Sequence, residues 1–189
     1  MPEGDTVWRT ARRLHAALAG APATLVDIRW GEVDEGRLTG AVVDEVVPRG
    51  KHLLHRFDSG WTLHTHLRME GSWRVEAAGS EAARRALRRT DLRAAIGTDA
   101  WTTLGLRLGE VDVVPRRVGH LGPDVLGEDW DPDLVVLRIS ECPPDVTIAA
   151  TLLDQRVLAG VGTFWASEAL FAQRLHPWRP ARDLTGDKI

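Results

Sequence analysis

The sequence of 189 residues is poor in cysteine and in long apolar runs. Cys142 is its single cysteine, so no disulfide can form within the chain, which suits a reducing cytoplasm. Mean hydropathy is -0.19, and no apolar stretch approaches the length of a membrane span. The segment after Met1 carries Glu3 and Asp5 instead of the basic start and apolar stretch of a secretory signal. We therefore expect a soluble cytoplasmic protein.

An excess of positive charge is also missing. The net charge is -3 and the isoelectric point is about 6.2, so any affinity for nucleic acid has to come from a local basic patch. Lysine is scarce as well, because Lys51 and Lys188 are the only lysines among 24 basic side chains. Lys51 either marks a place that needs a compact ammonium able to release its proton, or stands there by chance.

The first part of the chain predicts one helix followed by strands. Val7, Ala11, Leu14 and Leu18 have helical spacing, which predicts an amphipathic helix over residues 5–19 that ends at Gly20. The apolar period then changes to two. About eight short runs rich in β-branched and aromatic residues predict an antiparallel β-sandwich. These runs cover residues 25–30, 42–47, 52–57, 61–67, 72–76, 93–97, 101–108 and 110–114.

The strand pattern stops at residue 115, and the rest of the chain predicts helices. Residues 116–127 contain Gly119, Gly122 and Pro123 and are predicted to be a linker between a domain of residues 1–115 and one of residues 128–189. Helices are predicted over residues 131–139 and 147–157, and from Thr163, as the cap, to about residue 173. The fold class is therefore α+β, with a sandwich followed by an all-helical domain.

Pro2 and Glu3 place a secondary amine next to a carboxylate. If Met1 is removed, the free prolyl amine can attack an aldehyde carbon and form an electron-withdrawing iminium, with Glu3 as the proton donor. The alternative is a simple helix entry, in which Asp5 or Thr6 is the N-cap and the acidic side chains favour the positive end of the helix dipole. These residues alone leave both interpretations open.

A second candidate site lies between the predicted helices. In the segment Leu152–Thr163, Gly160 and Gly162 allow two tight turns, and the helix that begins at Thr163 would present free N–H groups to a phosphate. The alternative is a helical hairpin whose glycines only make room for packing.

Five motifs in order resemble the formamidopyrimidine-DNA glycosylase/endonuclease VIII (Fpg/Nei) family, and together they span nearly the whole chain. The fifth motif is a helix-two-turn-helix. The motifs are Pro2-Glu3-Gly4, Arg49-Gly50-Lys51-His52-Leu53, His66-Leu67-Arg68-Met69-Glu70-Gly71, Leu121-Gly122-Pro123-Asp124, and the segment that ends at Gly160-Val161-Gly162-Thr163.

The resemblance, closer to the endonuclease VIII branch, implies a bifunctional DNA glycosylase and AP lyase of base excision repair that favours oxidised pyrimidines. Pro2 would attack C1′ of the damaged nucleotide, Glu3 would relay protons at the sugar, and Lys51 would contact the phosphate and assist proton transfer. Arg68, Met69 and Glu70 would form the wedge that enters the duplex. A core methionine is the alternative for Met69, but its neighbours are both charged.

The resemblance further implies DNA contacts by His120, Gly160, Gly162 and Thr163. Thr163 stands where the family usually has an Asn, so weaker or reshaped phosphate binding is expected. The family's C-terminal four-cysteine zinc finger cannot be built from one cysteine, so the sequence is expected to be truncated and to contain no metal site or cofactor. The implied protein is a monomer in the bacterial cytoplasm that binds damaged double-stranded or single-stranded DNA.

Two other classes stay open. A non-catalytic damaged-DNA-binding relative would keep the helix-two-turn-helix but could lose Pro2, Glu3 or Lys51, and all three are present. An N-terminal proline enzyme acting on small keto acids would share Pro2 but would need neither the wedge nor the phosphate-binding turns.

Overall fold

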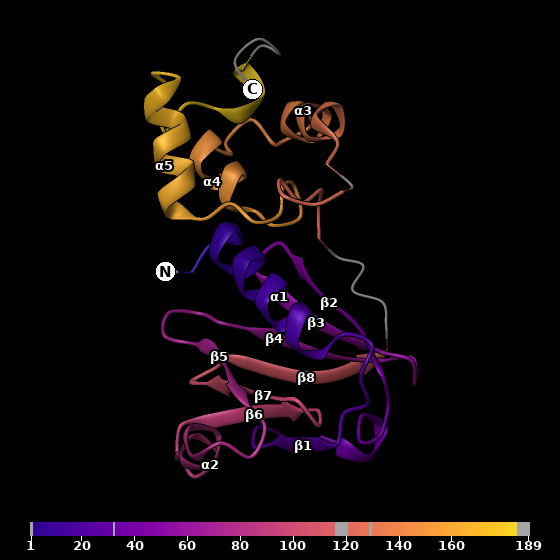
Figure 1. Cartoon of the computed structure of the whole chain (residues 1–189). Coiled ribbons are helices and arrows are strands. Elements are labelled where there is room, and N and C mark those ends of the chain that lie inside the picture. The colour runs from indigo at the N-terminus through magenta and orange to yellow at the C-terminus, as the bar shows by residue number, and fades with distance from the viewer. Residues whose placement is uncertain (1, 32, 116–120, 129, 185–189) are drawn as a thin grey trace. The chain divides into compact units, whose positions relative to one another are not determined.

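The computed structural model describes residues 2–31, 33–115, 121–128 and 130–184 (Figure 1). The chain divides into two compact units, one of residues 1–2 and 6–117 and the other of residues 3–5 and 118–189. The predicted domain limits at residues 115 and 128 stay predictions. Residues 121–127 pack within the second unit. There Asp124 is buried and forms a parallel β-bridge with Ala159. No helix in the described part of the chain is long and apolar enough to cross a membrane.

Helix α1 (Gly4–Leu18) has the amphipathic character that its spacing predicts. Its four predicted core residues, from Val7 to Leu18, are completely buried. The helix already begins at Gly4, so Asp5 and Thr6 lie in its first turn, which excludes the alternative in which one of them is the N-cap. The backbone carbonyl of Thr6 accepts a hydrogen bond from the Thr10 hydroxyl at 2.8 Å, one turn further along the helix.

The first unit is the predicted antiparallel sandwich of two four-stranded sheets (Figure 1). One sheet has the order β1-β6-β7-β5 and the other the order β2-β3-β4-β8. The eight strands are β1 (Leu25–Ile28), β2 (Val43–Arg49), β3 (His52–Phe57), β4 (Trp61–His66), β5 (Ser72–Ala77), β6 (Leu92–Gly97), β7 (Trp101–Leu106) and β8 (Glu110–Pro115). A short turn, η1 (Glu35–Arg37), and a seven-residue helix, α2 (Glu81–Leu87), complete the unit.

Alternate residues of the strands fill the core of the sandwich. Leu53, Phe57 and Leu63 are fully buried, in one cluster with the inner face of α1. The same core contains a histidine, His55, whose ring lies 5.0 Å from that of Trp73 in the facing sheet. Burial lowers the pKa of His55 from 6.5 to about 4, because the apolar surroundings disfavour the charged ring.

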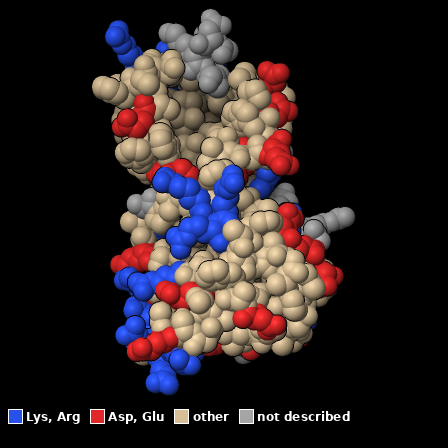
Figure 2. Space-filling model, viewed as in Figure 1, with Lys and Arg blue, Asp and Glu red and all other residues tan. Residues whose placement is uncertain are grey.

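Basic side chains gather locally on the first unit although the net charge is negative. Figure 2 shows Lys and Arg groups over α1 and near α2. On α1 the exposed arginines are Arg9, Arg12 and Arg13, and on α2 they are Arg84 and Arg85. Exposed arginines are therefore grouped on these two helices despite the negative net charge.

The second unit consists of short helices: α3 (Pro132–Ser140), α4 (Ile148–Leu153), α5 (Thr163–Ala172) and the turn η2 (Ala181–Asp183). Val135, Ile139, Ile148 and Leu170 form its core. Helix α4 is shorter than the predicted residues 147–157. It ends because the Asp154 carboxylate accepts the backbone N–H of Arg156 at 2.9 Å, which turns the chain away from the helix.

Candidate active site

Glu3 is a buried carboxylate in the second unit, only 4% exposed. Its Oε1 accepts the backbone N–H of Phe164 at 2.9 Å, and its Oε2 accepts those of Gly162 at 3.1 Å and Trp165 at 3.2 Å. These donors are the otherwise unpaired N–H groups at the start of α5, where the helix dipole also favours a negative charge. Glu3 is therefore held in one orientation by the helix-two-turn-helix.

The two glycines of the turns are required by this arrangement. A Cβ on Gly162 would lie 2.5 Å from Cδ of Glu3, so any side chain would displace the carboxylate. Gly160 has φ of 98°, a left-handed conformation that favours glycine, and its carbonyl accepts the N–H of Gly4 at 3.0 Å. Both glycines thus let residues 3 and 4 approach the turn closely.

The capping of α5 corrects two expectations. Gly162 is the N-cap and Thr163 is the first helical residue, so the prediction that Thr163 caps the helix is wrong. The prediction that the helix presents free N–H groups outward fails for Gly162, Phe164 and Trp165, because Glu3 accepts all three. The Thr163 side chain is exposed and can still offer its hydroxyl to a phosphate.

Gln155 is a residue that the sequence analysis missed. Its amide nitrogen donates to the carbonyls of Leu153 at 3.1 Å and Val161 at 2.9 Å, and its amide oxygen accepts the N–H of Gly160 at 3.0 Å. One side chain therefore fixes both ends of the two turns that hold Glu3. Its position just after a helix, ahead of two close glycines, is the only sequence signal for this role.

A cavity of about 430 Å³ lies beside these turns within the second unit. Apolar side chains line almost all of it, among them Val135, Ile139, Trp130 and Trp165. The cavity offers almost no polar group to hydrogen-bond the edge of a base, so we do not assign it to lesion recognition.

Pro2 and Lys51 belong to the first unit, where Pro2 is half-buried. Lys51 follows Gly50, whose φ of 59° makes the tight turn between β2 and β3. The charges of Lys51 and Arg68 both act on the pKa of His66, which lies on the neighbouring strand β4. Burial and the charge of Arg68 lower the pKa of His66. Two of the predicted DNA-contacting side chains therefore lie at the same end of this sheet.

The predicted wedge is an exposed loop between β4 and β5. Met69 is 67% exposed, which excludes the core methionine. Arg68 has a φ of 53°, a strained conformation for a non-glycine residue, and its N–H donates to Nδ1 of His66 at 2.9 Å. Glu70 pairs with Arg107 at 3.2 Å. The loop is held at its base while the methionine projects from it.

The last predicted DNA-contacting residue, His120, lies outside the described residues. The other predicted residues fall into two sets, each within one unit. The first unit carries Pro2, Lys51 and the wedge, and the second carries Glu3 and the turns from Gly160 to Thr163.

Family models match both parts of the chain. The formamidopyrimidine-DNA glycosylase N-terminal domain matches residues 1–117, and the formamidopyrimidine-DNA glycosylase H2TH domain matches residues 121–189. The chain belongs to the formamidopyrimidine-DNA glycosylase/endonuclease VIII family. This membership accounts for the sandwich and for the helix-two-turn-helix together.

Among its relatives, this glycosylase-family chain is similar to endonuclease VIII proteins. It is 45% identical to a probable endonuclease 8 2 of Streptomyces coelicolor, over 100% of the chain and 69% of that protein. It is 41% identical to the DNA-(apurinic or apyrimidinic site) lyase Nei2 of Mycolicibacterium smegmatis, over 97% of the chain and 71% of that protein.

Solved structures of the family share the fold. The Fpg protein of Thermus thermophilus matches with a TM-score of 0.77 and 30% identity, over 99% of this chain and 70% of that one. The Lactococcus lactis Fpg bound to DNA containing an AP site matches with a TM-score of 0.81 over 99% of this chain and 74% of that one. At 20% identity, the second likeness concerns the fold alone.

Proposed function

We propose that the protein is a bifunctional DNA glycosylase and AP lyase that removes oxidised bases through an iminium on Pro2. The observation that carries the proposal is the buried Glu3 carboxylate, fixed by three backbone N–H groups directly after Pro2 in the chain. If Glu3 served only at the entry to α1, its carboxylate would not need to bond the start of α5, near the other end of the sequence. The names of the relatives, endonuclease 8 and AP lyase, support the same reaction class.

In the proposed reaction, removal of Met1 leaves Pro2 with a secondary amine. The amine nitrogen attacks C1′ of the damaged nucleotide, the base leaves with the electrons of the glycosidic bond, and opening of the sugar ring gives an iminium. The iminium acidifies the C2′ hydrogen, so its loss drives elimination of the 3′ phosphate. Hydrolysis then returns the amine. The covalent step needs no cofactor, because Pro2 supplies the nucleophile.

Glu3 is proposed to relay protons at the sugar. An ionised carboxylate has about four lone-pair sites, and three of them accept N–H groups of α5. One acceptor direction therefore remains for a substrate proton. Lys51 is proposed to contact a phosphate and assist proton transfer, a role for which a compact ammonium is suited.

The DNA partner is proposed to be held by both units. The exposed Met69 would fill the space left in the duplex when the lesion is extruded, while Arg68 and Glu70 flank it. Thr163 would contact the DNA backbone through its exposed hydroxyl, in place of the usual amide. Gly160 and Gly162 are buried, and their N–H groups already donate to Gln155 and Glu3, so their part would be to shape the turn. The protein would work as a monomer in the bacterial cytoplasm.

Oxidised pyrimidines are the proposed substrates, because the similar relatives are named endonuclease 8. A panel of duplexes tests the proposal. Each duplex carries an oxidised pyrimidine, 8-oxoguanine, an AP site or no lesion, and strand cleavage is followed on a denaturing gel. Cleavage of the AP-site and oxidised-pyrimidine duplexes, with the intact duplex untouched, is expected. Binding to these duplexes without cleavage would instead identify a non-catalytic damaged-DNA-binding protein.

A further inference from the structure

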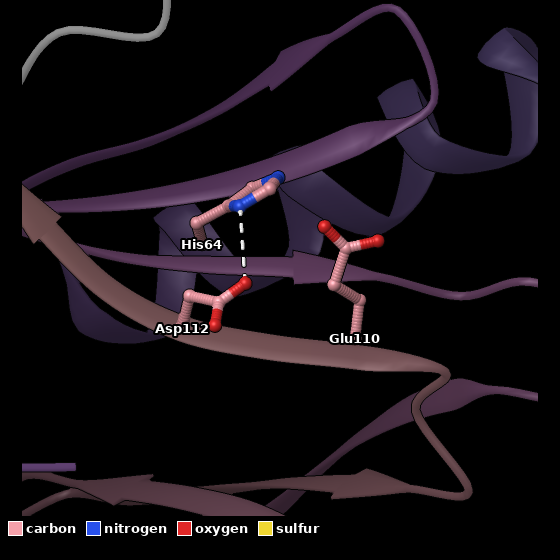
Figure 3. A group of neighbouring side chains, drawn as sticks. All are labelled: His64, Glu110 and Asp112. Atoms are coloured by element: carbon pink, nitrogen blue, oxygen red, sulfur yellow. Dashed lines mark ion pairs between the residues drawn. The ribbon is translucent and has the colours of Figure 1, made fainter. Parts of the chain in front are cut away.

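Three potential metal ligands converge on one face of the sheet of β2, β3, β4 and β8. His64 comes from β4, and Glu110 and Asp112 come from β8 (Figure 3). The two strands pair antiparallel, with His64 opposite Asp112. Glu110 is two residues from Asp112, so both carboxylates point to the same face. Strand pairing therefore brings one imidazole and two carboxylates together from a rigid scaffold.

The ligand atoms lie close enough for a side-chain rotation to bring them around a single ion. One nitrogen of His64 and one oxygen of each carboxylate all lie within 4.8 Å of one another, and Nδ1 of His64 is 3.9 Å from Oδ2 of Asp112. Tetrahedral zinc, with ligand bonds of about 2.0–2.2 Å, needs separations of roughly 3.4 Å. His64 is 8% exposed and well fixed, whereas the Asp112 side chain is 55% exposed and free to rotate inward.

A neighbouring histidine orients the imidazole. The Nε2 atom of His64 lies 2.7 Å from Nδ1 of His52. A neutral imidazole has one N–H and one lone pair. When Nε2 of His64 donates to His52, its Nδ1 keeps the lone pair and faces the carboxylates. Metal-binding histidines usually have such a second partner, which fixes the tautomer and the ring.

We propose that His64, Glu110 and Asp112 form a binding site for a divalent transition-metal ion, with water completing the coordination. One nitrogen and two carboxylate ligands suit Zn²⁺ or Mn²⁺, whereas Mg²⁺ and Ca²⁺ prefer oxygen ligands alone. The site differs from the family's cysteine finger in ligands and in place. The site also contacts the wedge loop, because Oε2 of Glu110 accepts a hydrogen bond from Nη2 of Arg68 at 3.2 Å. A bound ion would compete with Arg68 for that carboxylate.

Isothermal titration calorimetry of the tag-free, chelator-treated 189-residue protein with ZnCl₂ tests the site. We expect one high-affinity Zn²⁺ per chain, and an affinity roughly tenfold or more lower for Asp112→Asn and for Glu110→Gln. Asp99→Asn, an exposed acid elsewhere on the first unit, and His176→Asn, an exposed histidine of the second unit, are matched controls that should bind as the wild type does.

Nitrogen NMR of the histidine rings gives a second measurement that does not depend on variants that fold poorly. Zn²⁺ should shift Nδ1 of His64 while Nε2 keeps its proton. The proposal is overturned if Asp112→Asn binds Zn²⁺ as tightly as the wild type, or if the His64 nitrogens do not respond. In that case His64 and Asp112 form an ordinary ion pair.

Discussion

Oε1 of Glu3 accepts the backbone N–H of Phe164 at 2.9 Å, although the two residues are 161 positions apart in the chain. The residue after the proposed nucleophile thus accepts the backbone N–H groups at the start of α5 in the helix-two-turn-helix. Folding of the second unit and orientation of Glu3 are consequently one event, and a change at either end of this contact should affect both.

Glu3→Gln should lower both stability and activity. The amide can accept through its oxygen only, so its NH₂ group would face at least one backbone donor that Glu3 now satisfies. Leaving buried donors unpaired costs about 1–3 kcal/mol of unfolding free energy. Urea unfolding and AP-site cleavage are the measurements, with the exposed Glu128→Gln as the control. Wild-type stability in Glu3→Gln would contradict the capping role.

Gly162→Ala should be destabilising only while Glu3 is present. The new Cβ would lie 2.5 Å from Cδ of Glu3, so the carboxylate would have to move and its three hydrogen bonds to backbone N–H groups would be weakened or lost. In a Glu3→Ala background the space is free, so the same substitution should cost much less. A double-mutant cycle of unfolding free energies should therefore give an interaction energy of about 1–3 kcal/mol. Additive effects would show that the glycine serves another purpose.

Stability should fall in mild acid because of His55. Its pKa is 6.5 in the unfolded chain and about 4 in the folded one, so the unfolded state binds more protons between these values. The contribution of the neutral His55 ring to the free energy of unfolding is fully present above pH 6.5 and is lost as the pH falls toward 4. The expected loss is about 3 kcal/mol, at about 1.4 kcal/mol for each pH unit of the difference.

Urea unfolding across this range of pH measures that loss. His55→Leu, which retains an apolar side chain against Trp73, should flatten the curve in this window. An unchanged slope in the variant would assign the acid sensitivity to other groups.

Met69→Ala should lower the excision rate on duplex substrates and leave the rate on single-stranded substrates nearly unchanged. The side chain is exposed, so unfolding free energy should change by less than about 0.5 kcal/mol. Excision from duplex DNA should drop, because the duplex stack has to be opened, whereas a lesion in single-stranded DNA needs no wedge. Lesion excision rates on the two substrates decide this, with exposed Leu137→Ala as the control. Equal losses on both substrates would exclude a wedge role.

The sequence contains enough to predict most of the local elements, although helix α2 was not among those predicted. The spacing of Val7, Ala11, Leu14 and Leu18 predicted α1, and alternation predicted the eight strands, because burial of one face imposes these periods directly. The end of α4 was predicted too late, since the turn depends on the Asp154 carboxylate bonding the backbone of Arg156.

Contacts between distant segments could not be predicted in this way. The start of α5 is bonded to Glu3, at the opposite end of the chain. The sequence therefore indicated Thr163 as the N-cap, whereas the N-cap is Gly162. The approach of His64 to Asp112 likewise depends on the register of β4 with β8, which the residues of the two strands alone do not specify. The Fpg/Nei motifs identified Glu3 but not its three donors.

Borohydride trapping tests the central claim most directly. The protein without Met1 is incubated with an AP-site duplex and sodium borohydride, and the covalent product is digested and mapped by mass spectrometry. The reduced adduct should lie on the N-terminal peptide at the Pro2 nitrogen, and Pro2→Ala should trap far less. An adduct on Lys51, or a Pro2→Ala variant that traps as well as the wild type, would contradict catalysis by the N-terminal proline.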